Sequence, residues 1–466
     1  MELTKGPVHF IGIGGIGMSG IARILLQIGL PVFGSDIKES DTVKNLKKLG
    51  AKIFIGHAAE NITENIKTVV FSSAVSQDNP ELLKAKKLGI NVIPRAEMLA
   101  RLMTRQKSIA VAGAHGKTTT SAMISLMLEL NNCDPTVIIG GELKQIGSNA
   151  KLGKGKYLVA EADESDGTFL LLSPHIAVIT NIENDHLDYY RSVNNIVSAF
   201  VRFVKQLPED GLAVISLDNK QLADIRDTVP GRYITYAVNH EGADYTVKNI
   251  SFKGMQSRCE VFYRGSKLGE LKLQVPGLHN ISNALAAISV GREIGLTFHQ
   301  VVLGLKEFSG AKRRFEFISK TNGITIVDDY AHHPTELQAT LKAAKNAGFS
   351  RIIAVFQPHR YSRTKLLQFE FGDSFHDADL IIIDEIYSAS EKPITGVTSG
   401  LIVNAIRNCS DKEVQYFKTE NEIVDFLARE ARSGDLVLTL GAGNIRRVGI
   451  RLAEELRLLG GNIVES

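Results

Sequence analysis

The chain has 466 residues, of which 44% are hydrophobic and 23% are charged. This composition is typical of a globular protein and excludes a largely disordered one, and at about 150 residues per domain the length predicts about three domains. Lys and Arg (54 residues) nearly balance Asp and Glu (51 residues), so the net charge of +3 provides no strong field that would favour nucleic acid or an anionic membrane as a partner.

The first residues lack the pattern of a signal peptide, and no apolar run approaches the ~18 residues of a membrane span, so we expect a cytoplasmic protein without a membrane partner. The three cysteines, Cys133, Cys259 and Cys409, are widely separated and odd in number. This usage fits a reducing compartment and predicts buried thiols rather than disulfides or a zinc site. The oligomeric state stays open between a monomer and a homodimer.

Short β-branched runs alternate with helical patterns along the chain, which predicts α/β architecture with parallel sheets. The strands expected in a first block are 8–11, 31–34, 69–72 and 91–93, with a helix over 22–27. A second block is expected to hold a strand at 108–112, a helix over 122–130, antiparallel strands within 243–275 and a helix over 279–293. A third block is expected to begin near Ile318, with strands at 324–327, 352–356, 380–383 and 436–440. With a linker around 102–107, the expected domains are 1–104, 105–317 and 318–466.

A first glycine loop, Gly12-Ile13-Gly14-Gly15-Ile16-Gly17, follows the first predicted strand, and Asp36 ends the next strand 19 residues beyond Gly17. This spacing is a dinucleotide-binding pattern. The same geometry binds any diphosphate at a helix N-terminus, so NAD and a UDP-linked substrate are both candidates.

A second glycine loop, Gly113-Ala114-His115-Gly116-Lys117-Thr118, follows the strand at 108–112. In such a loop, backbone N–H groups and a helix N-terminus face phosphate oxygens, the lysine adds a positive charge, and the hydroxyl can hold Mg²⁺. The general pattern also has a glycine where this chain has Val111, so the match is partial. Two phosphate loops in one chain favour two phosphorylated substrates, one of them ATP, over a dehydrogenase.

Acidic and polar runs follow two further strands, namely Glu161-Ala162-Asp163-Glu164-Ser165-Asp166 and Asn181-Ile182-Glu183-Asn184-Asp185-His186. Because ligands of open α/β sheets bind at the carboxyl edge, both runs are expected to converge on the second glycine loop. Carboxylates with a neutral imidazole could hold a divalent cation that neutralises charge on a transferred phosphoryl group. The alternative is a solvated acidic loop.

Polar residues also crowd two segments of the third block. The run 327–336 follows a strand and precedes a helix over 337–345, and Arg360 and Arg363 follow the strand at 352–356. Guanidinium groups bind carboxylates and phosphates in a bidentate manner, although exposed cations on a helix face would look the same in the sequence. The basic segment 310–316 is either a further anion site or a basic hinge.

Taken together, these motifs resemble the Mur ligase family over the whole chain. The segments that carry the resemblance are 12–20, 113–120, 161–166, 181–186, 279–283, 313–316, 329–336 and 356–364. The resemblance implies an N-terminal Rossmann-like domain for a UDP-sugar, a central P-loop ATPase-type mixed α/β domain, and a C-terminal Rossmann-like domain for an amino acid. It further implies a ligase that uses ATP and Mg²⁺ to join L-alanine to the carboxylate of UDP-N-acetylmuramate through an acyl phosphate, in peptidoglycan precursor synthesis.

The resemblance also implies site residues, carried over by motif. The ATP-binding residues would be Gly113, Ala114, His115, Gly116, Lys117, Thr118, Thr119, Asn283, Arg314 and Asp329. The residues for the UDP-linked substrate would be Gly12, Gly14, Gly15, Gly17, Met18, Ser19 and Asp36. Magnesium would be held by Thr118, Glu161 and His186, and the catalytic residues would be Lys117, Glu161, His186, His332, Arg360 and Arg363. Some family members carry a carbamylated lysine downstream of the magnesium histidine, but Val201 and Arg202 occupy that neighbourhood here, so no carbamate is expected.

Three alternatives remain at this stage. A ligase of the same family could join the sugar acid to a preformed peptide. An NAD-dependent oxidoreductase would use the first glycine loop, but it would leave the second loop and the acidic runs without a purpose. A nucleotide-binding regulator would bind ATP without amino-acid-dependent phosphate release.

Overall fold

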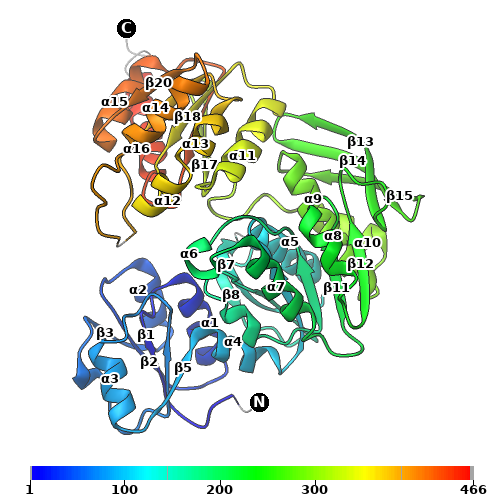
Figure 1. Ribbon diagram of the computed structural model, residues 1–466, viewed down its shortest axis with the longest axis vertical. Coiled ribbons are helices and arrows are strands. Elements are labelled where there is room, and N and C mark those ends of the chain that lie inside the picture. Colours follow the sequence, from blue (N-terminus) through cyan, green and yellow to red (C-terminus); the bar gives the residue numbers. More distant parts are fainter. Residues whose placement is uncertain (1–2, 144, 390, 462–466) are drawn as a thin grey trace. The chain divides into compact units, whose positions relative to one another are not determined.

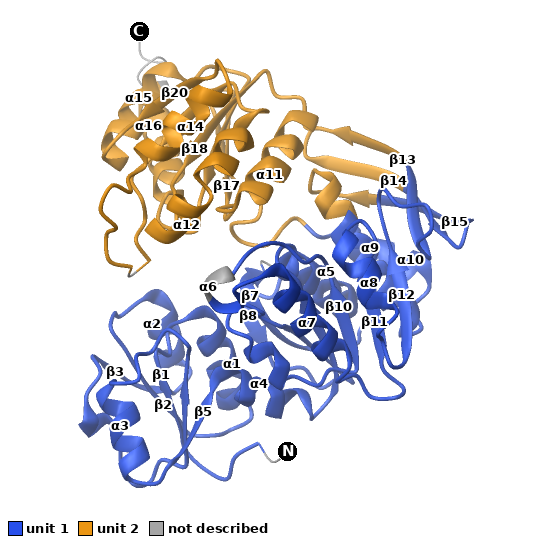
Figure 2. Ribbon diagram, viewed as in Figure 1, with its two compact units in different colours: residues 1–248, 260–271, 282–308 blue, residues 249–259, 272–281, 309–466 orange. Residues whose placement is uncertain are grey.

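The computed structural model describes residues 3–143, 145–389 and 391–461. Within these residues the strands form three sheets, which follow one another along the chain (Figure 1). The chain divides into two compact units (Figure 2). The first unit comprises 1–248, 260–271 and 282–308, and the second comprises 249–259, 272–281 and 309–466.

The first sheet is parallel, with the strand order β3-β2-β1-β4-β5. Its strands are β1 (Val8–Ile11), β2 (Val32–Asp36), β3 (Lys52–Ile55), β4 (Thr68–Phe71) and β5 (Asn91–Pro94). The helices of this region are α1 (Ile16–Gln27), α2 (Asp41–Lys48), η1 (Ala59–Asn61), α3 (Pro80–Lys87) and α4 (Arg95–Met103). Strand β1 is buried along its whole length, as expected for a central parallel strand. The strand order reverses beside β1, so the first glycine loop lies at the topological switch point, where α/β sheets bind ligands.

The second sheet has the strand order β15-β14-β13-β12-β11-β10-β6-β9-β7-β8. Its strands are β6 (Lys107–Ala112), β7 (Thr136–Leu143), β8 (Ser148–Lys151), β9 (Tyr157–Glu161), β10 (Ile176–Ile179), β11 (Leu212–Ser216), β12 (Arg232–Tyr236), β13 (Tyr245–Lys253), β14 (Gln256–Tyr263) and β15 (Ser266–Leu273). Its helices are α5 (Lys117–Leu130), η2 (Thr168–Leu171), α6 (Leu187–Tyr190), α7 (Val193–Val204), α8 (Lys220–Arg226), α9 (Leu278–Glu293) and α10 (Phe298–Lys306). Strand β6 is parallel to both of its neighbours, β9 and β10, so the loops that follow these three strands meet at one edge.

The third sheet, in the second unit, has the strand order β16-β17-β21-β18-β19-β20. Its strands are β16 (Glu316–Thr321), β17 (Ile324–Asp329), β18 (Arg351–Phe356), β19 (Leu380–Ile383), β20 (Glu413–Tyr416) and β21 (Asp435–Leu440). Its helices are α11 (Pro334–Asn346), α12 (Tyr361–Leu366), α13 (Gln368–Gly372), η3 (Asp373–Phe375), α14 (Gly400–Cys409), α15 (Glu420–Glu430) and α16 (Arg446–Gly461). Only β16, at one edge, is antiparallel to its neighbour among the strand pairs of this sheet that the structure describes.

The predicted three-part α/β architecture is confirmed, and the strands foreseen in each block are present. The pattern missed several strands, namely β3, β7, β8, β11, β12, β16 and β20. The helices expected at 22–27 and 122–130 begin earlier, at Ile16 and Lys117, because each starts directly after a glycine loop. The linker expected around 102–107 is shorter in the structure, where α4 ends at Met103 and β6 begins at Lys107. Of the three cysteines only Cys259 is buried, and Cys409 is exposed, which corrects the expectation of buried thiols.

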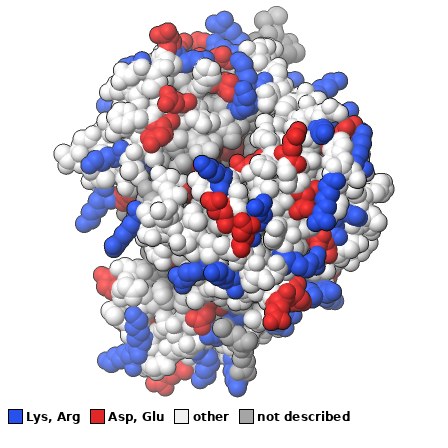
Figure 3. All heavy atoms as spheres, turned by 45° about the vertical axis from the view of Figure 1, so that its right-hand side comes forward, with Lys and Arg blue, Asp and Glu red and all other residues white. Residues whose placement is uncertain are grey.

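On the face shown in Figure 3, basic and acidic side chains are interspersed, in keeping with the small net charge. Among the residues that the structure describes, no helix is both long and apolar enough to cross a membrane.

Candidate functional site

The second glycine loop joins β6 to α5 at the edge where β9 and β10 also end. Gly113 has φ +133° and Gly116 has φ +82°, a region that residues with a Cβ rarely adopt. A Cβ atom at Gly113 would overlap Thr180 Oγ1, and one at Gly116 would lie 2.6 Å from Asn283 Oδ1. Both positions therefore require glycine for conformation and for space.

Asn181, which follows β10, fixes the shape of this loop. The backbone N–H of Ala114 donates to Asn181 O (3.1 Å), and that of His115 donates to Asn181 Oδ1 (2.8 Å). In return, Asn181 Nδ2 donates to His115 O (3.0 Å). The backbone amides of Ala114 and His115 are thus already used within the protein, so a contact of these amides with ATP would require a rearrangement.

Lys117, the first residue of α5, points to a carboxylate of the protein itself. Its Nζ lies 2.9 Å from both Oε1 and Oε2 of Glu164 and also donates to Gly113 O (2.6 Å) and Ala114 O (3.3 Å). Burial disfavours the charged amine, but the nearby carboxylates of Glu164 and Asp163 outweigh it and raise the pKa of Lys117. The amine is therefore a buried cation with an internal partner.

Thr118 and Glu161 place a hydroxyl oxygen and a carboxylate next to each other beside Lys117. Thr118 Oγ1 donates to Glu161 Oε2 (3.2 Å), while Glu161 Oε1 accepts hydrogen bonds from Gly140 N (2.6 Å) and Ser121 Oγ (3.2 Å). A hydroxyl and a carboxylate at the mouth of a phosphate loop are the hard oxygen ligands that Mg²⁺ prefers. The donor set therefore fits a magnesium ion at this position.

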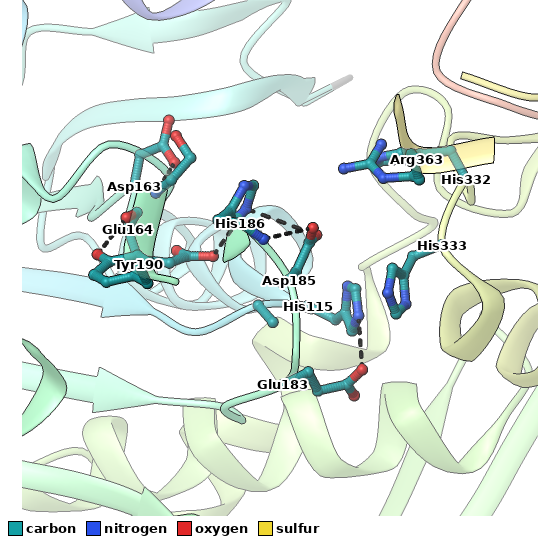
Figure 4. Close-up of polar contacts among 12 residues, drawn as sticks. His115, Asp163, Glu164, Glu183, Asp185, His186, Tyr190, His332, His333 and Arg363 are labelled. Atoms are coloured by element: carbon teal, nitrogen blue, oxygen red, sulfur yellow. Dashed lines mark hydrogen bonds and ion pairs between the residues drawn. The ribbon is translucent and has the colours of Figure 1, made fainter. Parts of the chain in front are cut away.

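His186, the third expected magnesium ligand, follows β10 in a left-handed conformation with φ +59°. Its Nε2 lies 3.8 Å from Glu164 Oε1 and 3.7 Å from Asp185 Oδ2 (Figure 4). A small pocket adjoins this histidine, and its lining residues are Ala114, Glu164, Ile182, Glu183, Asp185, His186, Tyr190, Ile196 and Phe200. The structure thus places His186 beside the carboxylate that pairs with Lys117.

The other members of the acidic runs have separate partners. Asp163 accepts a hydrogen bond from Ser165 N (3.1 Å) and lies 3.5 Å from Arg95 Nη2. Asp166 accepts hydrogen bonds from the backbone N (3.0 Å) and the Oγ1 (2.6 Å) of Thr168. The expected convergence of both runs on the second glycine loop is confirmed, since Glu164 of one run and Asn181 of the other both contact it.

Asn283, on α9, lies against the second glycine loop within the first unit. Its Oδ1 accepts a hydrogen bond from Thr120 Oγ1 (3.1 Å), and the residue is buried. The expectation that it contacts adenine stays a prediction, and the structure adds a contact with α5.

The first glycine loop contacts a carboxylate at the end of the neighbouring strand β2. Gly14 N donates to Asp36 Oδ2 (2.8 Å), and Gly12 has φ +78°. Met18 and Ser19, expected to contact the UDP-linked substrate, are buried in α1, where Ser19 Oγ donates to Ile16 O (3.0 Å).

In the second unit, Asp329 organises the loop after β17. Its Oδ2 accepts a hydrogen bond from Phe315 N and its Oδ1 one from Ala331 N, each at 2.7 Å, and burial raises its pKa to about 6. Arg314 Nη1 lies 3.7 Å from Glu336 Oε1.

Arg313, in the basic segment 310–316, has partners within the protein. Its guanidinium donates to Asp328 Oδ2 (3.0 Å) and to the backbone oxygens of Gly441, Ala442 and Gly443 (2.5, 3.3 and 3.0 Å). This arginine therefore anchors the loop after β21.

The rings and guanidinium groups expected after β17 and β18 lie in one cluster. The His332 ring is 5.4 Å from that of His359, which stacks on Tyr387 with a centroid distance of 5.7 Å. Arg363 Nη1 lies 3.4 Å from His359 Nδ1, and Arg360 is exposed with φ +72°. Burial and the neighbouring cations lower the pKa of His359 to about 3, so its ring is neutral near pH 7.

Sequence reasoning missed three contributors to the sites. Arg95 contacts Asp163 and lies against Gly17, Gly140 binds Glu161, and Glu164 pairs with Lys117. Glu164 stood in the acidic run, but nothing in the spacing singled it out as the partner of the lysine. Arg95 and Gly140 carry no motif, and only tertiary contacts reveal them.

A strand, a glycine loop with a buried lysine, and a hydroxyl–carboxylate pair at one sheet edge define a phosphate-loop nucleotide-binding α/β protein. Three family models match the chain: "Mur ligase family, catalytic domain" over residues 7–107, "Mur ligase middle domain" over 111–291, and "Mur ligase, glutamate ligase domain" over 313–443. The chain belongs to the Mur ligase family.

Curated relatives match over nearly the whole chain. A UDP-N-acetylmuramate–L-alanine ligase of Pelotomaculum thermopropionicum is 54% identical over 453 residues, which is 97% of this chain and 98% of the relative. The ligase of the same name from Geotalea daltonii is 49% identical over 97% of this chain and 98% of its own length.

Solved structures agree with this placement. The UDP-N-acetylmuramate-alanine ligase of Thermotoga maritima superposes with a TM-score of 0.83 at 31% identity, covering 98% of this chain and 100% of that one. A murein peptide ligase of Psychrobacter arcticus gives a TM-score of 0.72 at 26% identity, covering 97% and 99%.

Proposed function

We propose that the protein is an ATP-dependent ligase that joins L-alanine to the carboxylate of UDP-N-acetylmuramate. The observation that carries this proposal is the cluster of Lys117, Thr118 and Glu161 after β6 and β9, which has the chemistry of an ATP-magnesium site. The relative of 54% identity that bears this activity in its name supports the choice of substrates.

In the proposed reaction, a carboxylate oxygen of the sugar acid attacks the γ-phosphorus of ATP, and ADP leaves with the electrons of the broken bond. The amine of L-alanine then attacks the acyl carbon of the acyl phosphate, and inorganic phosphate leaves as the amide bond forms. Lys117 would bind the γ-phosphate, and Thr118 and Glu161, with His186 nearby, would hold Mg²⁺, which neutralises phosphate charge when bound. Positioning and electrostatic stabilisation would provide most of the rate acceleration.

The remaining site residues receive substrate roles in this proposal. Gly12 to Gly17 with Asp36 would bind the UDP part at the N-terminus of α1. Arg360 and Arg363 would bind the carboxylate of the amino acid, with the neutral His359 ring beside them.

The test is phosphate release from Mg-ATP in the presence of UDP-N-acetylmuramate, with L-alanine, glycine, L-serine or a tripeptide added in turn. We expect release to be fastest with L-alanine. Release only with the tripeptide would reassign the protein to peptide recycling, in line with its similarity to the murein peptide ligase. Release with none of these acceptors would contradict the ligase function.

A further inference from the structure

The lysine of the second glycine loop is held by an internal anion. Glu164 approaches Lys117 Nζ with both carboxylate oxygens at 2.9 Å, and the two side chains are only 3% and 17% exposed, respectively. Glu164 is itself positioned by Tyr190, whose hydroxyl donates to the Glu164 backbone oxygen (2.6 Å), as Figure 4 shows. The ion pair is thus enclosed and well oriented.

The donors of Lys117 are already committed in this arrangement. An ammonium group has three N–H donors, and here they face Gly113 O, Ala114 O and the Glu164 carboxylate. A phosphate oxygen that accepts a hydrogen bond from Lys117 must therefore displace one of these acceptors. The Glu164 carboxylate is the one that a phosphate would displace, because it is the anion among the three and the two negative charges repel each other. Binding of the triphosphate and the Glu164 contact compete for one cation.

We propose that Glu164 is a positioning residue that holds Lys117 in place until ATP arrives and releases it to the γ-phosphate. The inference rests on the proposed function, because that function assigns the γ-phosphate to Lys117. The affinity for ATP is then set below its intrinsic value by the free energy of the Lys117–Glu164 pair.

The released carboxylate does not become isolated. His186 Nε2 lies 3.8 Å from Glu164 Oε1, so the cation that His186 would help to hold in the proposed function would offset the charge of the released carboxylate. This arrangement keeps the cost of the exchange moderate, since removing one member of a buried ion pair without replacement is strongly unfavourable.

Asp163 provides a matched control. It is the neighbouring carboxylate and contributes to the field at Lys117, but its hydrogen-bonding partners are Ser165 and Arg95. Asp163→Asn therefore removes one negative charge from the same loop without removing a contact to the lysine.

The experiment measures the dissociation constant of the non-hydrolysable analogue adenylyl imidodiphosphate with Mg²⁺, by calorimetry, for the full-length wild type, Glu164→Gln and Asp163→Asn. We expect Glu164→Gln to bind the analogue about tenfold more tightly, the size expected when a charge-assisted contact no longer competes. We expect a smaller gain for ADP, which lacks the γ-phosphate, and little change for Asp163→Asn.

Three further measurements distinguish the proposed effect from a folding defect. The free Glu164→Gln protein should melt at a lower temperature than the wild type, yet gain more thermal stability from the analogue. Glu164→Asp retains the charge on a shorter side chain, and its affinity for the analogue should lie between those of the wild type and Glu164→Gln. In a Lys117→Met background, Glu164→Gln should no longer improve analogue binding, because the amine for which Glu164 and the phosphate compete is absent.

Unchanged or weaker analogue binding in Glu164→Gln would overturn the inference, as would an equal gain in Asp163→Asn, which would indicate a general charge effect. Failure of the wild type to bind the analogue at all would instead remove the proposed function. The two failures are therefore distinguishable.

Discussion

The two glycine loops of the first unit share one backbone design and differ in the charge placed at it. Each follows a buried parallel strand and begins a helix, and each contains a glycine with positive φ. The first loop faces the Asp36 carboxylate through the N–H of Gly14, whereas the second contains Lys117 and rests on Asn181. A strand–loop–helix element therefore provides backbone donors for an anion, while the charges of the surrounding side chains determine which anion binds.

The charge difference has a functional meaning. The Asp36 carboxylate beside the first loop can accept hydrogen bonds from hydroxyl groups, whereas Lys117 at the second loop attracts a terminal phosphate. Under the proposed function, the first loop would bind the sugar nucleotide and the second would bind ATP.

The largest expected effect comes from removing the charge that distinguishes the second loop. Lys117→Ala should lower kcat for ATP-dependent phosphate release by about 1000-fold, because a cation that neutralises phosphoryl charge is lost. Steady-state phosphate release measures this effect. Lys87→Ala, on the exposed side of α3, is the control, and equal losses in both variants would contradict the role of Lys117.

A pair of glycine substitutions compares the loops directly. Gly113→Ala combines φ +133° with an overlap on Thr180, so its free energy of unfolding should fall by about 3 kcal/mol. Gly12→Ala has φ +78° but its nearest neighbour, Val75 Cγ2, would be 4.0 Å away, so a fall of about 1 kcal/mol is expected. Urea unfolding measures both values, and the reverse order would contradict the assigned packing.

The third prediction concerns Asp36. Asp36→Ala removes the acceptor of the Gly14 N–H, and should weaken binding of UDP-N-acetylmuramate about tenfold, since a charge-assisted hydrogen bond organises the loop. Binding of the ATP analogue should stay unchanged. Calorimetry with each ligand distinguishes an effect on the first loop from an effect on the second. An equal loss of affinity for both ligands would show that the substitution damages the whole unit.

The smallest effect is a pH dependence of stability near the first loop. Glu81 is buried, and although burial raises its pKa, the adjacent His9 ring and hydrogen bonds from Ser35 and Asn61 outweigh this and lower the pKa below the ordinary value of 4.5. The folded state then favours the ionised form, so this contribution to stability is present above pH 4.5 and is lost as the pH falls through the lower folded-state pKa.

In Glu81→Gln the free energy of unfolding should therefore change less between neutral pH and about pH 3 than in the wild type. Urea unfolding at several pH values measures the difference. A steeper pH dependence in the variant would show that the direction of the shift is wrong.

Much of the fold could be read from the sequence because its signals are local. Fully apolar β-branched runs such as Ile176 to Ile179 predicted buried parallel strands, and the glycine loops marked strand-to-helix junctions. The missed strands lie mostly away from the sheet centres or are partly exposed. Strand β3, for example, contains only three consecutive apolar residues, and so short a run does not distinguish a strand from other structure.

The sequence by itself determined which residues carry charge, which turns need glycine, and which polar runs follow strands. These properties depend on residue type and short-range spacing. Only the tertiary structure decided the pairings, such as Lys117 with Glu164, Glu161 with the backbone of Gly140, and Arg95 with Asp163. Such contacts join residues that are far apart in the chain, and their formation depends on strand order and helix packing, which no local pattern records.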